Sequence, residues 1–256
     1  MNDRQVTIAA LDGIPRIRAG DDLAQLLIAA LERQAIVPRR HDILVVAQKV
    51  VSKAEGRFLD LAAVEPDPRA RELAAIVKKD VRLVAAILGE SAAVLRAVPH
   101  VLIVSTHRGL VMAHAGIDRS NIEPEDQGRR VLLLPEDPDA SARRLKDRID
   151  VHFRTEIGVI VSDSVGRAWR LGTVGLAIGA AGVPSLWDRR GETDLTGRPL
   201  EATEVGFADA VAAAAVLAMG EAAEARPAVL VRGLHWSAPD KPASALIRPE
   251  SEDLFR

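Results

Sequence analysis

The hydrophobic residues of this chain fall into short β-branched runs and longer stretches with a helical period. Each short run is bounded by charged, Gly or Pro residues, as buried strands are. The longer stretches repeat apolar positions every three to four residues, which indicates helices. The runs that predict strands are residues 43–46, 101–104, 131–134, 159–161 and 229–231. The stretches that predict helices are residues 22–34, 68–88, 140–153 and 205–219.

These elements do not alternate as a regular βαβ repeat would require. Their unequal spacing favours an α+β architecture, with mixed sheets and helices. The Gly-rich stretch 172–199 has no clear period and indicates loops or irregular strands. Residues 237–256 carry three prolines and are expected to form a C-terminal arm that either packs on the protein or stays mobile.

Composition places the chain among ordinary globular proteins. Its 256 residues are enough to bury a substantial core as one large domain or two small ones. With 48% hydrophobic residues and a net charge of −2, we expect no nucleic-acid partner that depends on bulk positive charge. The absence of Cys excludes disulfides and thiolate chemistry. The segment MNDRQVTI lacks a basic stretch followed by an apolar one, and no apolar run reaches membrane length, so we expect a cytoplasmic protein without a membrane partner.

Two acidic residues follow apolar runs and suggest a metal site. Asp118 lies in the segment HAGIDRSN, and Asp163 follows the run 159–161 with Ser164 beside it. Asp, Ser and Asn are also common turn and helix-cap residues, so a plain turn explains Asp118 equally well. Taken together, these side chains offer the hard oxygen ligands that suit Mg²⁺ or Mn²⁺, ions that often share ligands with substrate phosphates. The pair therefore predicts a phosphate-bearing ligand.

Basic residues near these acids are consistent with an anion site. Arg119, Arg167 and Arg170 lie within a few positions of the aspartates, and guanidinium groups match phosphate or carboxylate oxygens. A chain with 34 Lys and Arg residues also places some of them there by chance. In VVAQKVVSKAEGR, residues 45–57, an apolar strand runs into the polar residues Gln48, Lys49, Ser52 and Lys53. A lysine there could neutralise a nucleotide phosphate or only protect a strand edge. Neither the Walker pattern nor GxGxxG occurs in the chain.

Four segments, in this order along the chain, resemble the coenzyme F420-0:L-glutamate ligase family. They are VAQKVVSKAEGR, AGIDRSN, LLLPEDPDASAR and SDSVGRAWRLG. The similarity extends from GIPRI near the start, through TEVGFADA, to LVRG, and so covers nearly the whole chain up to about Gly233. The resemblance is to the stand-alone form of the family.

This resemblance implies an enzyme that uses GTP and divalent cations to add L-glutamate to coenzyme F420-0, a deazaflavin phosphodiester. The first addition makes an amide at the lactyl carboxylate, and later additions are γ-linked. We expect activation of that carboxylate as an acyl phosphate, because hydroxide is a poor leaving group. The resemblance also implies a catalytic region over residues 1–236, built of two intimately associated subdomains, and an intertwined homodimer.

The resemblance assigns roles residue by residue. Asp118 and Asp163 match metal-binding aspartates, with Ser164 at a second Mg²⁺ or Mn²⁺ and Glu221 as a further ligand; a monovalent cation such as K⁺ is also expected. Lys53 is expected to offset phosphate charge, and Arg167 and Arg170 to bind the acceptor or glutamate. The residues that correspond to guanine-nucleotide contacts are Ile14, Pro15, Arg16, Ile17, Gln48, Lys53 and Asn121.

Two departures from the family pattern leave the acceptor open. His114 stands where the family has Asn, and TVG at 173–175 stands where many bacterial members have Gln-Thr. One alternative is a γ-glutamyl-type ligase that acts on another carboxylate. The other is a nucleotide- or deazaflavin-binding protein that has lost catalysis.

Overall fold

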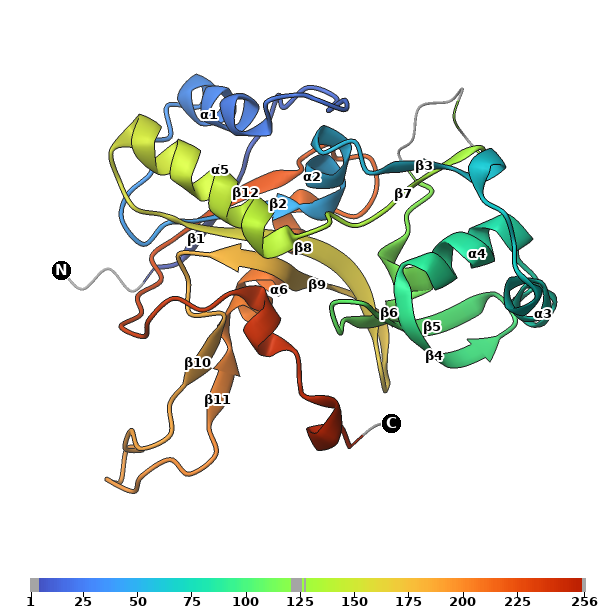
Figure 1. Ribbon diagram of the computed structural model, residues 1–256. Helices are drawn as coiled ribbons and strands as arrows, with labels where there is room; N and C mark the ends of the chain where they lie inside the picture. Colours follow the sequence, from blue (N-terminus) through green and yellow to red (C-terminus); the bar gives the residue numbers. More distant parts are fainter. Residues whose placement is uncertain (1–4, 121–125, 127, 255–256) are drawn as a thin grey trace.

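A five-stranded sheet forms the centre of the protein, and helices cover both of its faces (Figure 1). The computed structural model describes residues 5–120, 126 and 128–254. Among the strands of this sheet, β2 and β8 pair in parallel, and the other neighbouring pairs are antiparallel. In spatial order the strands are β1 (Thr7–Ala10), β12 (Ala228–Arg232), β2 (Ile43–Ala47), β8 (Gly158–Arg167) and β9 (Arg170–Ala181).

Two hydrophobic clusters lie on the two faces of this sheet. On one face, Leu44 and Val46 of β2 pack in a cluster that includes residues of α1 (Leu23–Arg33) and α5 (Pro138–Phe153). On the other face, Ile43 and Val45 join a cluster with α6 (Phe207–Met219). Because alternate residues of a strand point to opposite faces, a strand covered on both sides reads as a continuous apolar run. This explains why β2 and β8 were readily predicted.

The Gly-rich stretch 172–199 was expected to hold loops or irregular strands, and residues 172–181 are strand. They belong to β9, a strand of 12 residues whose pairing with β8 is irregular, with register shifts between Val161 and Ser162 and between Gly166 and Arg167. A Cβ atom at Gly175 would lie 2.3 Å from the carbonyl oxygen of Ala212 in α6, and one at Gly179 would lie 2.2 Å from that of Pro138 in α5. The glycines therefore let one helix backbone approach each face of the strand, a tertiary requirement that overrides their low strand propensity.

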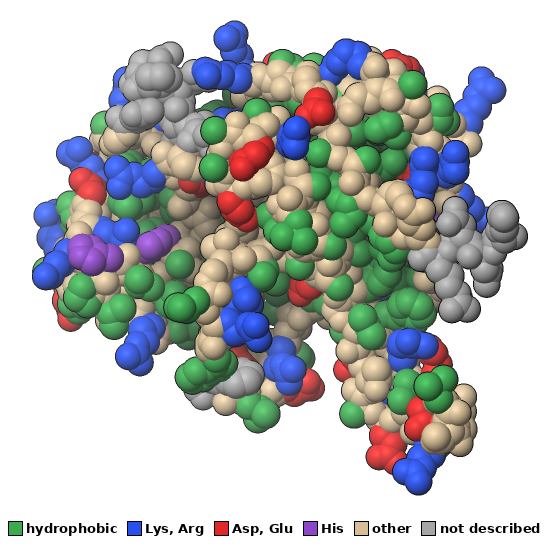
Figure 2. Space-filling model, turned by 180° about the vertical axis from the view of Figure 1, so that it is seen from behind, with side chains coloured by type: hydrophobic (Ala, Val, Ile, Leu, Met, Phe, Trp, Pro, Cys, Tyr) green, Lys and Arg blue, Asp and Glu red, His purple; other side chains and the backbone are tan. Residues whose placement is uncertain are grey.

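The remainder of that stretch forms part of a projecting hairpin. Strands β10 (Leu186–Asp188) and β11 (Glu204–Gly206) pair antiparallel, and the loop between them extends away from the body. Figure 2 shows this projection at the lower right, with acidic and basic side chains together at its end. The hairpin also carries ion pairs, such as that between Arg190 and Asp188 at 2.6 Å.

A second group of elements lies beside the main sheet (Figure 1). Strands β4 (Ser91–Val98), β5 (Val101–Thr106) and β6 (Val111–Ala113) form a three-stranded sheet. Its residues share a third hydrophobic cluster with two helices, α3 (Pro68–Val77) and α4 (Val81–Gly89). Strands β3 (Phe58–Asp60) and β7 (Arg130–Leu132) pair with each other, so the predicted strand 131–134 ends at Leu132.

The single helix predicted over residues 68–88 is in fact two helices. Lys78 adopts a left-handed conformation, with φ of 54°, and ends α3. Asp80 then caps α4, because its carboxylate accepts hydrogen bonds from the backbone N–H groups of Arg82 and Leu83 at 2.8 and 3.2 Å. Both helices present apolar faces to the same cluster, so the apolar period continues across the break.

Part of the predicted C-terminal arm packs on the body. Asp139, in the first turn of α5, accepts hydrogen bonds from the backbone of Ala243 at 2.8 Å and of Ser244 at 3.2 Å. These two residues begin the short helix η4 (Ala243–Leu246), and η5 (Glu250–Glu252) follows. The domain boundary at residue 236, the two subdomains and the homodimer stay predictions. Within the described ranges, no helix is both long enough and apolar enough to cross a membrane.

The ion pair between Arg232 and Asp42 is expected to stabilise the junction of β12 and β2. Asp42 is 1% exposed, and its carboxylate accepts from both Nε and Nη2 of Arg232, at 2.9 and 2.6 Å. Arg232→Ala would leave this carboxylate buried without its cation, so we expect the free energy of unfolding to fall by about 2 kcal/mol. Arg226→Ala is the control, because Arg226 pairs with Asp12 at a more exposed position. It should change the free energy of unfolding by about 0.5 kcal/mol or less. Equal denaturant midpoints for the two variants would contradict the prediction.

Candidate functional site

The candidate site lies where β2 passes directly into α2 (Gln48–Ala54), without a loop. Gln48, the first residue of α2, is 2% exposed, and its side-chain oxygen accepts a hydrogen bond from Ser52 Oγ at 2.9 Å. Lys49 follows, and its Nζ lies 2.8 Å from Asp118 Oδ2 and donates to Ser120 Oγ at 2.8 Å. The start of α2 therefore holds a buried amide and a lysine beside the first predicted metal ligand.

Asp118 is positioned by a left-handed bend and a β-bridge. His114, Ala115 and Gly116, which form η2, all have positive φ, at 55°, 55° and 69°. The backbones of Asp118 and Leu132 then exchange two hydrogen bonds of 2.9 Å. A left-handed conformation costs about 1 kcal/mol or more for a residue other than Gly. The bend is retained because the bridge and the surrounding packing hold it, and it fixes the direction of the Asp118 carboxylate.

Asp163 lies on β8, close enough to Asp118 for their charges to interact. Burial raises the pKa of Asp163 to about 6, and the Asp118 carboxylate also acts to raise it. Hydrogen bonds from the Ser164 N–H, at 2.9 Å, and from the Gln48 side chain oppose this shift in pKa, as does the charge of Lys49. Two carboxylates and one lysine therefore share a partly buried site.

Ser164 and Glu221 form a separate pair. Ser164 Oγ donates a hydrogen bond to Glu221 Oε1 at 2.7 Å. Successive strand residues point to opposite faces, so Ser164 faces the α6 side of the sheet while Asp163 faces the α2 side. Within the described part of the chain, no three His, Cys, Asp or Glu side chains form a group that could hold a metal ion. The predicted metal ligands are thus brought together as two pairs.

The pair of aspartates nevertheless fits a divalent cation. Their oxygens are hard ligands, and the single ammonium group of Lys49 offsets only one of the two negative charges. A positive ion between the carboxylates would also stabilise the ionised form of Asp163 against the burial that raises its pKa. Mg²⁺ commonly binds one or two carboxylates together with phosphate and water oxygens. Asp118 and Asp163 could hold one such ion, and Ser164 with Glu221 could supply oxygens to another.

The residues predicted to contact the nucleotide come from α2 and from the loop between β1 and α1. Ile17 is 5% exposed and packs in the core, whereas Pro15 and Arg16 are exposed. Further along this loop, the Gly20 N–H donates to the carbonyl oxygen of Ala54, at the end of α2, at 2.9 Å. The loop and α2 are thus tied together.

Of the other residues predicted to contact the nucleotide, two are half-buried and one lies outside the described residues. Ile14 is half-buried against the core cluster. Lys53 is half-buried and lies one helical turn beyond Lys49, on the same side of α2. Asn121 lies outside the described residues. Contact with a nucleotide stays a prediction for all of these positions.

The two predicted substrate-binding arginines lie at the tip of the β8–β9 hairpin. Arg167 and Arg170 are paired across the turn, and Arg167 Nη1 donates to the carbonyl oxygen of Gly172 at 3.1 Å. Both are exposed, and Arg167 lies four residues, or about 13 Å along the strand, from Asp163. The structure therefore does not bring them to the carboxylate pair, and their role stays a prediction.

The sequence singled out Lys49 only as one of two lysines beyond a strand, and it did not predict the contact of Lys49 with Asp118. The stretch 45–57 was interpreted as a strand that runs into polar residues, but its second half is α2. In a helix, Lys49 and Lys53 lie on one side and Gln48 and Ser52 on another. The spacing of Lys49 and Lys53 by four residues was the available signal.

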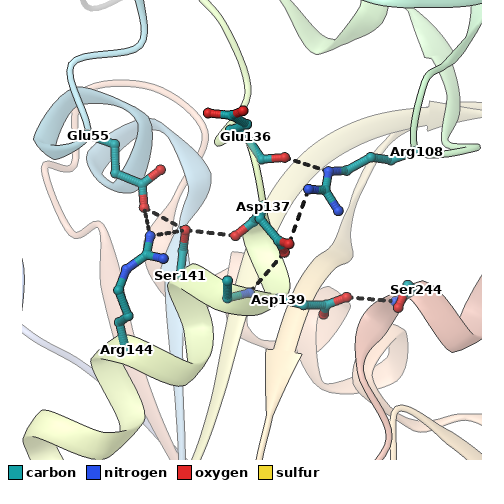
Figure 3. A network of polar contacts seen from close by, with 9 residues as sticks. Glu55, Arg108, Glu136, Asp137, Asp139, Ser141, Arg144 and Ser244 are labelled. Atoms are coloured by element: carbon teal, nitrogen blue, oxygen red, sulfur yellow. Dashed lines mark hydrogen bonds and ion pairs between the residues drawn. The ribbon is translucent and has the colours of Figure 1, made fainter.

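A cavity of about 620 Å³ was also not predicted. It lies between the turn after β5 and the segment that leads into α5, and its wall includes Arg57, Arg108 and Leu134. Figure 3 shows Arg108 reaching across to this segment, where it donates to the Glu136 carbonyl oxygen and pairs with Asp137 at 3.2 Å. None of the residues predicted for the site lines this cavity.

Comparison with known proteins identifies the family of this chain. Residues 13–233 match the family described as F420-0:Gamma-glutamyl ligase. A coenzyme F420:L-glutamate ligase of Methanothermobacter thermautotrophicus is 44% identical over 98% of this chain and 99% of its own length. A protein of the same name from Methanopyrus kandleri is 45% identical over 94% of each chain. Another, from Archaeoglobus fulgidus, is 42% identical over 98% of this chain and 97% of its own length. The chain therefore belongs to the F420-0:gamma-glutamyl ligase family and is an enzyme of the ligase class.

Proposed function

We propose that this protein uses GTP and divalent cations to ligate L-glutamate to coenzyme F420-0. The relatives named above are ligases of coenzyme F420 and L-glutamate, and the match extends over nearly their whole length. The observation that carries the proposal is the meeting of Asp118, Asp163 and Lys49 at the end of β2, which is suited to a metal-bound phosphate.

The proposed reaction activates a carboxylate and then displaces phosphate from it. The acceptor carboxylate attacks the γ-phosphorus of GTP, and the bond from that phosphorus to the β-phosphate oxygen breaks, which gives an acyl phosphate and GDP. The amine of L-glutamate then attacks the acyl carbon, inorganic phosphate leaves with the bonding electrons, and the nitrogen loses a proton. Such transfers depend mainly on positioning and on neutralising phosphate charge.

The residues of this chain have separate parts in that scheme. Asp118 and Asp163 would hold Mg²⁺ or Mn²⁺, with Ser164 and Glu221 at a second ion; a bound ion supplies neutralisation of phosphate charge. Gln48 orients the Asp163 carboxylate through their hydrogen bond. Lys49 holds Asp118 in place, and Lys53 is the lysine proposed to offset phosphate charge.

We also propose that the enzyme acts as a homodimer. Large apolar side chains are fully or nearly fully exposed on α6, at Leu217, and at the tip of the β8–β9 hairpin, at Trp169 and Leu171. Apolar groups of this size on a single chain are typical of surfaces that another chain covers. Sedimentation velocity of the purified protein should give the mass of two chains, and a single-chain mass would contradict the proposal.

Mass spectrometry of the reaction products tests the proposed function. Protein incubated with coenzyme F420-0, L-glutamate, GTP and Mn²⁺ should yield a product heavier by one or more glutamyl units. Omission of GTP, or addition of a chelator, should abolish this gain, and Mg²⁺ or Mn²⁺ in excess should restore it. A gain that is insensitive to chelator would contradict the metal role. No gain from protein that still binds GTP would favour another acceptor.

A further inference from the structure

The cavity of about 620 Å³ has the size and lining of a small-molecule site. Sites for drug-sized ligands have volumes of roughly 300 to 1,000 Å³ and combine apolar walls with a few polar groups. Here the apolar walls include Leu110, Leu134 and Pro138, and the polar groups include Arg57 and Arg108. A free amino acid would fill only a fraction of this space. The cavity therefore suits a larger ligand with both an apolar body and polar ends.

Two arginines give the cavity its capacity to bind acid groups. Arg57 donates from Nε to the Leu134 carbonyl oxygen at 2.9 Å, and its Nη2 lies 3.5 Å from Glu90 Oε2. Arg108 is held in a similar way, by the Glu136 carbonyl oxygen and the Asp137 carboxylate. A guanidinium has five N–H donors, and the described contacts of each arginine leave some of them unused.

The carboxylates of the cavity do not cancel this capacity. Among the described residues, Arg57 and Arg108 each have one ion-pair partner, Glu90 at 3.5 Å and Asp137 at 3.2 Å, which leaves further N–H groups on each. Glu136 contacts Arg108 through its backbone, and its exposed carboxylate points away from that arginine (Figure 3). Both guanidinium groups are therefore fixed in direction by protein contacts while they still offer donors to a ligand. Such fixed donors bind carboxylate and phosphate oxygens with little loss of side-chain entropy.

The cavity lies next to the candidate metal site along two chain segments. Asp118 is bridged to Leu132, and the cavity wall contains Ala115 on the first segment and Leu134 on the second. Ala115 is three residues from Asp118, and Leu134 is two residues from Leu132, so the Cα atoms of both wall residues lie within about 10 Å of the bridge. A Cβ at Gly116 would lie 2.9 Å from Leu134, which confirms that the two segments are in contact. An elongated ligand in the cavity could thus extend one end to Asp118.

We propose that this cavity binds the acceptor of the ligation, an elongated organic acid whose carboxylate or phosphodiester oxygens accept hydrogen bonds from Arg57 and Arg108. The proposal rests on the proposed function. The nucleotide is expected instead at the loop 14–17 and α2, and free glutamate is too small for the volume. The acceptor is the remaining substrate, and its apolar ring system would lie against Leu110 and Leu134.

Equilibrium binding of coenzyme F420-0 tests the proposal. Its deazaflavin fluorescence polarisation would be followed with Mg²⁺ and a GTP analogue that cannot transfer its γ-phosphate. Arg57→Gln and Arg108→Gln should each raise the dissociation constant about 10-fold or more, because each removes a charged donor. Arg108→Glu should raise it further. Arg190→Gln is the matched control, because Arg190 is half exposed and ion-paired as Arg108 is, but lies on the β10–β11 hairpin.

The possible outcomes separate the two proposals. If the unsubstituted protein binds coenzyme F420-0 and the Arg108 variants bind it as well as the Arg190 control does, the cavity proposal is overturned while the proposed function stands. If the unsubstituted protein does not bind it, both are overturned. Competition by L-glutamate that depends on Arg57 and Arg108 would assign the cavity to glutamate and overturn the choice of acceptor. Because Arg108 is half exposed at a turn, its variants should unfold at the temperature of the unsubstituted protein.

Discussion

Replacing Asp163 with Ala is expected to lower the rate of glutamate ligation about 1,000-fold or more while the protein stays folded. The carboxylate is one of two that would hold the cation at the transferred phosphate, and loss of such charge stabilisation removes several kcal/mol from the transition state. Product formation measured by mass spectrometry at saturating GTP and Mn²⁺ would give the rate. Turnover within about 10-fold of the unsubstituted protein would contradict the assignment of Asp163.

The folded state should not depend on this carboxylate. At pH 7 Asp163 is ionised although burial raises its pKa to about 6, above the unfolded value near 4, so its charge opposes folding at that pH. The opposition is absent below about pH 4, where both states bind the proton, and is complete above about pH 6. Asp163→Asn should therefore leave the free energy of unfolding of the metal-free protein at pH 7 unchanged, or raise it by about 1 kcal/mol.

A matched variant at Asp209 distinguishes a metal-binding role of Asp163 from the effect of replacing any half-buried aspartate. Asp209, in α6, is also half-buried with a raised pKa, caused by burial, and accepts a hydrogen bond from the Ala177 N–H at 2.9 Å. It lies across the sheet from Asp163. Asp209→Asn should retain most of the ligation rate, whereas Asp163→Asn should lose it. Equal losses in the two variants would show that the effect comes from disturbance of β8 and β9 rather than from a missing metal ligand.

Most strands and helices could be predicted, because each has its own hydrophobic period within a short stretch of the sequence. The buried runs in β2, β5, β8 and β12 and the amphipathic helices α1, α5 and α6 were found because a covered strand and a half-covered helix leave different periods in the sequence. The sequence left loops and irregular strands both open for β9, because Gly175 and Gly179, which the approaching helices require, give no clear period. The prediction failed for α2, which follows β2 without any turn residue to mark the change.

In the candidate site, too, the residues with a local sequence pattern were predicted, and those that only the fold brings together were not. Asp118 and Asp163 were found because each follows an apolar run and stands in a recognisable motif. The structure adds that both meet Lys49 and Gln48, whereas Arg167 and Arg170 stay at the hairpin tip. The cavity left no signal in the sequence, because its walls come from the segments around residues 57, 90, 106–110 and 134–138, which only the fold brings together.

Gly179→Ala is expected to lower the free energy of unfolding by about 3 kcal/mol or more. The added Cβ would lie 2.2 Å from the carbonyl oxygen and 2.3 Å from the carbonyl carbon of Pro138, which are backbone atoms and cannot rotate away. The start of α5 is also fixed to β9, since Asp139 Oδ1 accepts a hydrogen bond from the Ala180 N–H at 2.8 Å. The helix must therefore move off the sheet or lose this contact.

Gly166→Ala provides the control for this prediction, because a Cβ at Gly166, in β8, would meet no atom within 4 Å. Alanine there should leave the free energy of unfolding unchanged or raise it by about 0.5 kcal/mol, because it reduces the entropy of the unfolded chain. Denaturant unfolding of both variants measures the difference, and similar midpoints would contradict the packing argument.

Because Pro138 also lines the 620 Å³ cavity, displacement of α5 by Gly179→Ala should weaken binding of coenzyme F420-0 as well. Arg108 contacts the Glu136 and Asp137 positions directly before this helix, so the glycine that allows α5 to approach the sheet also sets the position of the proposed acceptor site.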